Sequence, residues 1–256
     1  MAGNKHTMHD NGGYTLEVNF NKIRSRAENR KGGAANLASL LPEPPNSADL
    51  RGTADDRCLA EMAKCIFRSG FSWKVVESKW PDFETVFLGF NAPALTFQPD
   101  EFWDDLASDK RIIRHGGKIA AVRNNAGFVS EIAAEHGSFG NFLASWPEHD
   151  IVGLWDLLAK RGSRLGGNTG RYFTRFIGKD SFIPSADVVT CLRDAGLQIA
   201  ENPTSKRDLR AMQEQFNAWH QKTGLCFVHL SRICAMSVGD NHAPEIIRTR
   251  GGMDGG

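Results

Sequence analysis

The stretch from Lys160 to Cys191 contains the residue types best suited to chemistry. A glycine-rich turn at residues 162–167 lies between two segments of helical spacing, and the second helix should begin near Asn168. A helix, a tight turn and a second helix bring several backbone N–H groups to one exposed point, which binds phosphate without reading base sequence. Asp187 follows as a lone carboxylate in an apolar setting. The pattern predicts a phosphate grip and a carboxylate that acts on the gripped molecule.

The composition places these residues in an ordinary globular protein. Of the 256 residues, 41% are hydrophobic and 24% charged, which suits one large core or two small lobes that share a cleft. No apolar run reaches membrane-spanning length, and the polar N-terminus lacks the apolar core of a secretory leader. The five cysteines are odd in number and lack C-x-x-C spacing, so we expect reduced thiols in a cytoplasmic protein.

The net charge of +1 hides a segregated charge pattern. Residues 22–31, 110–123 and 160–175 each hold five of the 31 Lys and Arg residues, with only Glu28 opposing them, while 77–109 is acidic. Any one cluster alone is best explained as a solvated helix end. Three clusters, one of them on the glycine turn, favour a polyanionic partner.

Apolar residues recur at helical spacing along most of the chain, and no segment alternates with the period of a strand. The sequence therefore predicts an all-α fold. We expect a disordered N-terminus at 1–17, one helical domain of two lobes at 18–238 with its hairpin at 160–178, and a flexible tail at 239–256. Within the domain, Trp80-Pro81 should separate two helices, because proline interrupts helical hydrogen bonding.

Several short motifs occur in one order, and together they are specific. They are Asp55-Asp56-Arg57-x-Leu59-x-Glu61, Ser69-Gly70-Phe71-Ser72-Trp73, Ile112-Ile113-Arg114-x-x-x-Lys118-Ile119, Glu135-His136-Gly137-Ser138-Phe139, Lys160-Arg161-Gly162, Gly167-x-Thr169-x-x-Tyr172 and Gly178. Over roughly residues 50–195 the chain resembles the bacterial 3-methyladenine DNA glycosylase I family, a branch of the helix-hairpin-helix glycosylase superfamily.

The resemblance implies a monomeric, two-lobed helical enzyme that grips double-stranded DNA and flips one alkylated nucleotide into a cleft. It would hydrolyse the N-glycosidic bond of a 3-methyladenine-like purine, near the nucleoid and without an organic cofactor. In relatives a monovalent cation can sit at the hairpin. The DNA contacts that the resemblance implies are Gly162, Arg164, Leu165, Gly166, Gly167, Asn168, Thr169, Gly170 and Lys118.

The resemblance also implies catalytic roles. Bifunctional members of the superfamily carry a lysine nucleophile immediately before the hairpin threonine, where this chain has Asn168. We therefore expect hydrolysis without strand cleavage. Asp187 lies where most members carry a catalytic aspartate, which stabilises an oxocarbenium-like state or activates water. The alternative for Asp187 is an N-cap of the helix that follows it.

The family's base pocket corresponds to Phe71, Ser72 and Trp73, with the tryptophan as the plate on which the extruded purine stacks. A tryptophan in a helical pattern is otherwise a core residue. Family members carry a glutamate eight residues before this tryptophan, where this chain has Cys65. A neutral thiol does not accept the same hydrogen bonds, and a small buried hydrophobe is the alternative role for Cys65.

The family also has a zinc clip made by Cys and His ligands, of which only Cys191 persists in this sequence. We therefore expect no structural zinc, since a tetrahedral site needs four ligands. Two other functions stay open from the sequence: a non-catalytic sensor of DNA damage, which Cys65 favours, and a helical scaffold. The N-terminal helix with the basic residues Arg24, Arg26, Arg30 and Lys31 would lie along DNA, close one side of the pocket or form a solvated helix face.

Overall fold

The computed structural model describes residues 19–249, and every regular element within them is helical. The all-α fold class is confirmed. Within the same residues no helix has the length and apolarity needed to cross a membrane. The predicted disordered segment 1–17 lies outside the described residues.

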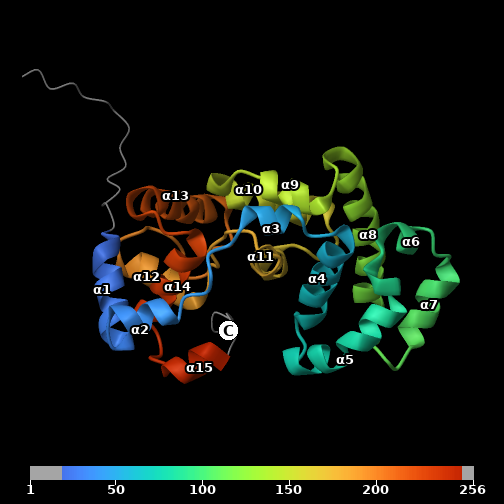
Figure 1. Ribbon diagram of the computed structural model, residues 1–256, viewed down its shortest axis with the longest axis horizontal. Helices are drawn as coiled ribbons and strands as arrows, with labels where there is room; N and C mark the ends of the chain where they lie inside the picture. Colours follow the sequence, from blue (N-terminus) through green and yellow to red (C-terminus); the bar gives the residue numbers. More distant parts are fainter. Residues whose placement is uncertain (1–18, 250–256) are drawn as a thin grey trace, which may run out of the picture.

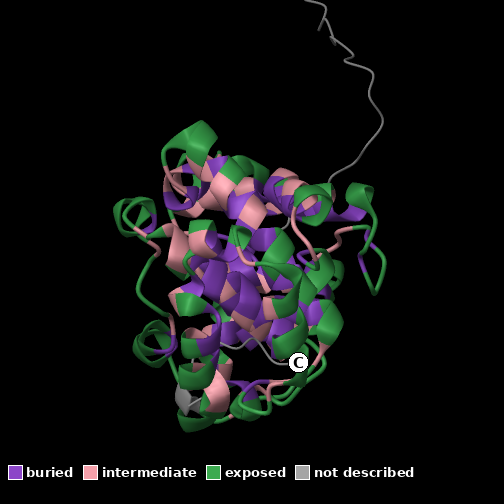
Figure 2. Ribbon diagram, turned by 90° about the vertical axis from the view of Figure 1, so that its right-hand side faces the viewer, coloured by how far each residue is buried: buried purple, intermediate pink, exposed green. Residues whose placement is uncertain are grey.

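Two separate hydrophobic clusters divide the molecule into two lobes, which lie on opposite sides in Figure 1. Figure 2 shows the buried residues in the interior and the exposed ones around the periphery. The first lobe consists of α3 (Ser47–Arg51), α4 (Asp55–Arg68), α5 (Trp73–Val86), η1 (Leu88–Phe90), α6 (Ala92–Thr96), α7 (Asp100–Ser108), α8 (Gly116–His136), α9 (Phe139–Ser145) and α11 (Gly167–Phe176).

The second lobe joins the two ends of the described chain. It consists of α1 (Phe20–Lys31), α2 (Ala34–Ser39), α12 (Ala186–Asp194), α13 (Lys206–Thr223) and α14 (Phe227–Ser237), followed by α15 (Pro244–Thr249). α1 packs against α14, so the first helix is held by one of the last (Figure 1). The predicted flexible tail thus includes α15, and its mobility stays a prediction.

One helix belongs to both lobes. α10 (Ile151–Arg161), which follows the short turn η2 (Glu148–Asp150), places Leu154 and Leu158 in the first core and Ile151 and Trp155 in the second. Each pair is four residues apart and therefore lies on one face of the helix. The two pairs, one in each core, fix the lobes relative to each other. The glycine hairpin follows directly at the end of α10.

The predicted break at Trp80-Pro81 is wrong, because α5 continues through Pro81. Trp80 is stacked between Phe83 and Phe90, with ring centroids 5.4 Å apart in each pair. Its indole Nε1 also donates to Glu84 one turn later. This packing offsets the hydrogen bond that a proline removes from a helix interior.

The basic cluster on α1 is largely used inside the protein. Arg30 donates to the carbonyl oxygens of Met236, Val238 and Gly239, and the Lys31 ammonium donates to Asn241 and His242. Cations near the end of a helix compensate unpaired carbonyl groups well. None of the positions predicted for this cluster, along DNA, at the pocket or as a solvated face, describes these two side chains.

The hairpin between α10 and α11 depends on a close approach of two backbone segments. Leu165 is buried under the turn, and its carbonyl oxygen lies so near Gly170 that a Cβ on Gly170 would collide with it. Gly167 adopts the left-handed region at φ +57°, which glycine enters without strain. Only glycine at position 170 therefore lets α11 begin where it does.

We predict that Gly170→Ala destabilises the hairpin, while Gly166→Ala does not. A Cβ on Gly166 meets only ordinary contact with Ala159, whereas one on Gly170 forces the Leu165 backbone to move. Overpacking of this kind costs about 1–3 kcal/mol. Urea unfolding of both variants measures the difference, and equal midpoints for the two would contradict the close approach.

Candidate functional site

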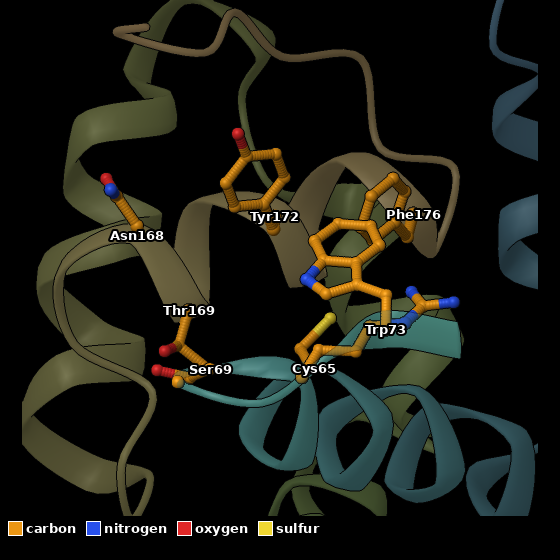
Figure 3. A pocket seen from close by; sticks show the side chains of 9 residues that line it. Cys65, Ser69, Trp73, Asn168, Thr169, Tyr172 and Phe176 are labelled. Carbon is orange, nitrogen blue, oxygen red and sulfur yellow. The ribbon is translucent and has the colours of Figure 1, made fainter. Parts of the chain in front are cut away.

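A cavity of about 210 Å³ opens at the face of the first lobe where α4, α5 and α11 meet. In Figure 3, Asn168 and Thr169 lie across it from Trp73, and Cys65 and Ser69 lie on the side of α4. Among the described residues, the lining is Cys65, Arg68, Ser69, Gly70, Trp73, Asn168, Thr169, Tyr172 and Phe176. The hairpin helix and the predicted tryptophan plate are therefore parts of one cavity.

Trp73 is the first residue of α5, and aromatic rings hold its indole. The Tyr172 and Phe176 rings meet it nearly edge to face, with centroids 6.1 and 5.8 Å away. Tyr172 and Phe176 also stack on each other. The indole nitrogen of Trp73 points toward the open space (Figure 3). An aromatic wall with one polar edge suits a flat heterocycle.

A cation already lies on the tryptophan. The guanidinium carbon of Arg68 is 4.6 Å from the centre of the Trp73 ring, and 5.4 Å from that of Phe176. Arg68 also pairs with Glu77 at close range and approaches Glu61 at 3.8 Å, while its Nε has no hydrogen-bond partner in the described structure. A half-buried guanidinium thus forms part of the cavity wall.

Cys65 lines the cavity as a neutral thiol. Only 5% of the residue is exposed, and burial raises its pKa well above the ordinary value of a thiol. Its Sγ donates to Glu61, 3.5 Å away and one turn earlier on α4. Burial also raises the pKa of Glu61, although Arg68 opposes the shift. The carboxylate nearest to the cavity therefore lies behind Cys65 and Arg68.

The N-terminus of α11 forms the opposite wall. Asn168 and Thr169 are in its first turn, where backbone N–H groups have no partner within the helix. The Asn168 side-chain oxygen accepts a hydrogen bond from Arg171, 3.2 Å away, which leaves the amide nitrogen free to donate. This end of α11 is favourable for a negative or electron-rich group.

Two residues predicted to line the base pocket lie outside it. Phe71 is 40% exposed and contacts the ring of His115 and the ammonium of Lys118 instead. Ser72 is the exposed N-cap residue of α5. Gly70, at φ +76°, reverses the chain here and turns both residues away from the cavity.

Lys118, predicted to contact DNA, is buried. Its ammonium donates to the carbonyl oxygens of Phe67, at 3.2 Å, and Ser69. Only 5% of the residue is exposed, and burial lowers its pKa, helped by Arg164. The prediction of a phosphate contact is wrong for this side chain, which instead fixes the turn that leads from α4 into the cavity.

The hairpin residues divide into buried and exposed groups. Leu165 and Gly170 are buried and shape the turn, whereas Arg164, Gly166, Gly167 and Asn168 are exposed. Gly162 and Thr169 are half-buried. Arg164 donates from Nε to the carbonyl of Gly117, 2.9 Å away, which ties the hairpin to the first turn of α8. The exposed members leave backbone groups open to a ligand.

Asp187 is not part of the cavity wall. It lies in the first turn of α12 in the second lobe, where its carboxylate is so close to Gly239 that a Cβ there would collide with it. The N-cap role weighed for it belongs to Ser185, whose side chain accepts from Val188 N. A catalytic role for Asp187 would therefore act across the two lobes.

Sequence reasoning assigned no site role to five wall residues: Arg68, Ser69, Gly70, Tyr172 and Phe176. A usable signal exists in the spacing, since Asn168, Tyr172 and Phe176 follow at steps of four and so share one face of α11. Arg68 is three residues after Cys65 and lies on the same face of α4. Neither spacing tells which face the cavity occupies.

The family's zinc clip does not fit the residues around Cys191. The thiol is 3.4 Å from the Ser237 hydroxyl and 3.8 Å from the Arg26 guanidinium, which places a cation beside the one remaining ligand. No three His, Cys, Asp or Glu side chains cluster as a metal site in residues 19–249. The absence of zinc stays a prediction.

Comparison with known proteins agrees with the motifs. Residues 52–160 match the model of a family described as methyladenine glycosylase. The match covers less than half of the chain and shows a likeness of this segment to the family. It agrees with the resemblance and with the expectation of a DNA glycosylase enzyme. Cys65, Arg68 and Trp73 lie within the matched segment, whereas α11 follows it.

Solved structures of 3-methyladenine DNA glycosylase I are similar to part of the chain. One is 23% identical and covers 53% of this chain and 82% of its own, with a TM-score of 0.44. A second, from Staphylococcus aureus, is 20% identical and covers 60% and 92%, with a TM-score of 0.46. No curated protein matches the chain.

We predict that Lys118→Met lowers the free energy of unfolding by about 1–3 kcal/mol, because two carbonyl groups lose their donor. Lys160→Met is the matched control, since Lys160 is exposed at the end of α10. Urea unfolding followed by circular dichroism measures both. Equal stabilities would contradict a structural role for Lys118.

Proposed function

We propose that the protein is a monofunctional DNA glycosylase, which hydrolyses the N-glycosidic bond of an alkylated, 3-methyladenine-like purine in duplex DNA. The observation that carries the proposal is the cavity beside the hairpin, walled by Trp73, Tyr172 and Phe176. Cavities of about 150 Å³ hold a benzene ring, so about 210 Å³ suits one flipped base.

The hairpin would grip the DNA backbone. Phosphate contacts position a protein on DNA without reading base sequence, and exposed N–H groups at the start of α11 supply such contacts. Arg114 and Arg164 are exposed cations near the start of α8, beside the same turn. Because this grip adjoins the cavity, a nucleotide flipped from the gripped strand would have a short path into it.

Hydrolysis would proceed without a covalent enzyme intermediate. Asn168 offers no amine for a Schiff base, and none of the nine cavity-lining residues is a lysine. The reacting carbon belongs to the sugar, which stays at the mouth of the cavity when the base is inside. A carboxylate from the second lobe, Asp187, would then stabilise the oxocarbenium-like state or orient the attacking water.

The proposed enzyme acts as a monomer on alkylated double-stranded DNA in the cytoplasm, close to the nucleoid. It needs no organic cofactor and no zinc. A monovalent cation bound by hairpin carbonyl groups would strengthen the phosphate grip, because it adds positive charge where the backbone approaches.

A second candidate is a non-catalytic sensor of DNA damage. Cys65 favours it, since the family's glutamate at this position is absent and the thiol stays neutral. Both candidates bind DNA with a steep salt dependence, so only turnover separates them.

We predict that the purified protein releases free alkylated purines from methylated duplex DNA and leaves the strand intact. Mass spectrometry of the released bases and borohydride trapping of a covalent intermediate provide the measurement. Release without trapping supports hydrolysis. If no base is released from any methylated duplex, the non-catalytic sensor of DNA damage is the remaining candidate.

We predict that Asp187→Asn abolishes release while DNA affinity stays within about twofold, since one neutralised side chain outside the grip changes few phosphate contacts. Asp194→Asn, in the same helix but exposed, is the control and should keep full activity. Single-turnover release and fluorescence anisotropy measure the two effects. Unchanged release in Asp187→Asn would remove this residue from the mechanism.

A further inference from the structure

Arg68 changes what the cavity can bind, because its guanidinium occupies one face of Trp73 at 4.6 Å. A flat base gains most from a tryptophan when it stacks on the ring face, and a cationic base gains additionally from the ring's quadrupole. On Trp73 that electrostatic attraction is already engaged by an internal cation. A second cation on the same indole would meet repulsion in place of unopposed attraction.

We propose that Arg68 makes the cavity select alkylated purines that stay neutral and carry hydrogen-bond acceptors at their edge, such as O6-alkylguanines, over cationic N3-alkylated adenines. The inference rests on the proposed glycosylase function, but it replaces the cationic 3-methyladenine-like base of that proposal with a neutral alkylated purine as the preferred ligand. It assigns Arg68 as a specificity-determining residue.

The polar groups of the wall are mainly donors. The Trp73 indole nitrogen points into the space (Figure 3), and the Asn168 amide nitrogen is left to donate. The hydroxyl groups of Ser69 and Thr169 complete the set. None of the lining residues is Asp or Glu. Such a wall satisfies a base with ring nitrogens and an oxygen as acceptors, and its side chains offer no carboxylate to a cationic base.

The charged groups around the cavity also favour a neutral base. Lys118 holds the Ser69 carbonyl from behind the turn, and Arg68 lies in the wall itself. The two nearby carboxylates, Glu61 and Glu77, pair with Arg68, and Lys64 also pairs with Glu77 at 3.1 Å. Both carboxylates lie outside the lining, so the charge that a bound base meets first is positive.

One rearrangement would oppose this inference. If Arg68 left the Trp73 face, Glu61 would become the acid available to a cationic base, one turn of α4 before Cys65. That outcome gives the reverse preference and is therefore a direct alternative in the same experiment.

Calorimetric titration with two base analogues of similar size tests the proposal without requiring turnover. The neutral probe is 9-methyl-O6-methylguanine, and the cationic probe is 3,9-dimethyladeninium, which keeps its charge at neutral pH. We expect the wild-type protein to bind the neutral probe at least about tenfold more tightly than the cationic probe. This ratio corresponds to the binding free energy of a single cation–aromatic contact.

Variants separate charge from shape. Arg68→Gln should bring the ratio of the two affinities close to one, and Arg68→Lys should largely preserve it, because the positive charge remains. Arg57→Gln is the matched control, since Arg57 is also on α4 but pairs with Glu84 away from the cavity. Circular dichroism verifies that each variant is folded, and the wild-type ratio decides the question even where a variant is not.

Three results would overturn the proposal: equal or tighter binding of the cationic probe by wild type, an unchanged ratio in folded Arg68→Gln, or no binding of either probe. The glycosylase function fails by a different observation, namely the absence of base release from methylated DNA. A protein that prefers the neutral probe but releases no base would keep the binding preference and lose the enzymatic role.

Discussion

The contact between Gly170 and the Leu165 carbonyl is the constraint from which the site follows. It allows α11 to begin directly after the turn and to lie against α4, with which it forms one of the more extensive helix pairs of the first lobe. That placement brings Tyr172 and Phe176 onto Trp73 and puts the N-terminus of α11 at the cavity. The proposed phosphate grip and the aromatic cavity therefore share one helix, which would couple the binding of the DNA backbone to that of the base.

Much of the helical architecture follows from local signals in the sequence. The capping residues Ser138 and Ser205 and the apolar spacing of α4, α8 and α13 predict helices that the structure contains. The break at Pro81 was not real, because the packing of Trp80 against Phe83 and Phe90 outweighs the local effect of proline. Local patterns indicate the secondary structure that a segment prefers in isolation. Where this preference conflicts with packing, tertiary contacts decide the structure.

The site was partly predictable for the same reason. Motif order identified Trp73, Cys65 and the hairpin, and these do share a cavity. The resemblance placed Lys118 on DNA, and Arg30 was expected along DNA, at the pocket or on a solvated helix face, yet both bind backbone carbonyls inside the protein. A count of charges along a chain does not distinguish a cation that meets solvent from one that caps an internal carbonyl. Side-chain direction, which depends on long-range packing, makes that difference.

The thiol of Cys65 and the guanidinium of Arg68 are best understood together. A glutamate at Cys65 would place a negative charge in the wall and would compete with Glu61 and Glu77 for the same guanidinium. With a buried thiol there instead, Arg68 keeps its two carboxylate partners behind it and its flat face on Trp73. The lining of the cavity thus combines a positive charge with an aromatic frame. Because different residues set the shape and the charge, the fit for a flat purine and the proposed preference for a neutral one depend on separate side chains.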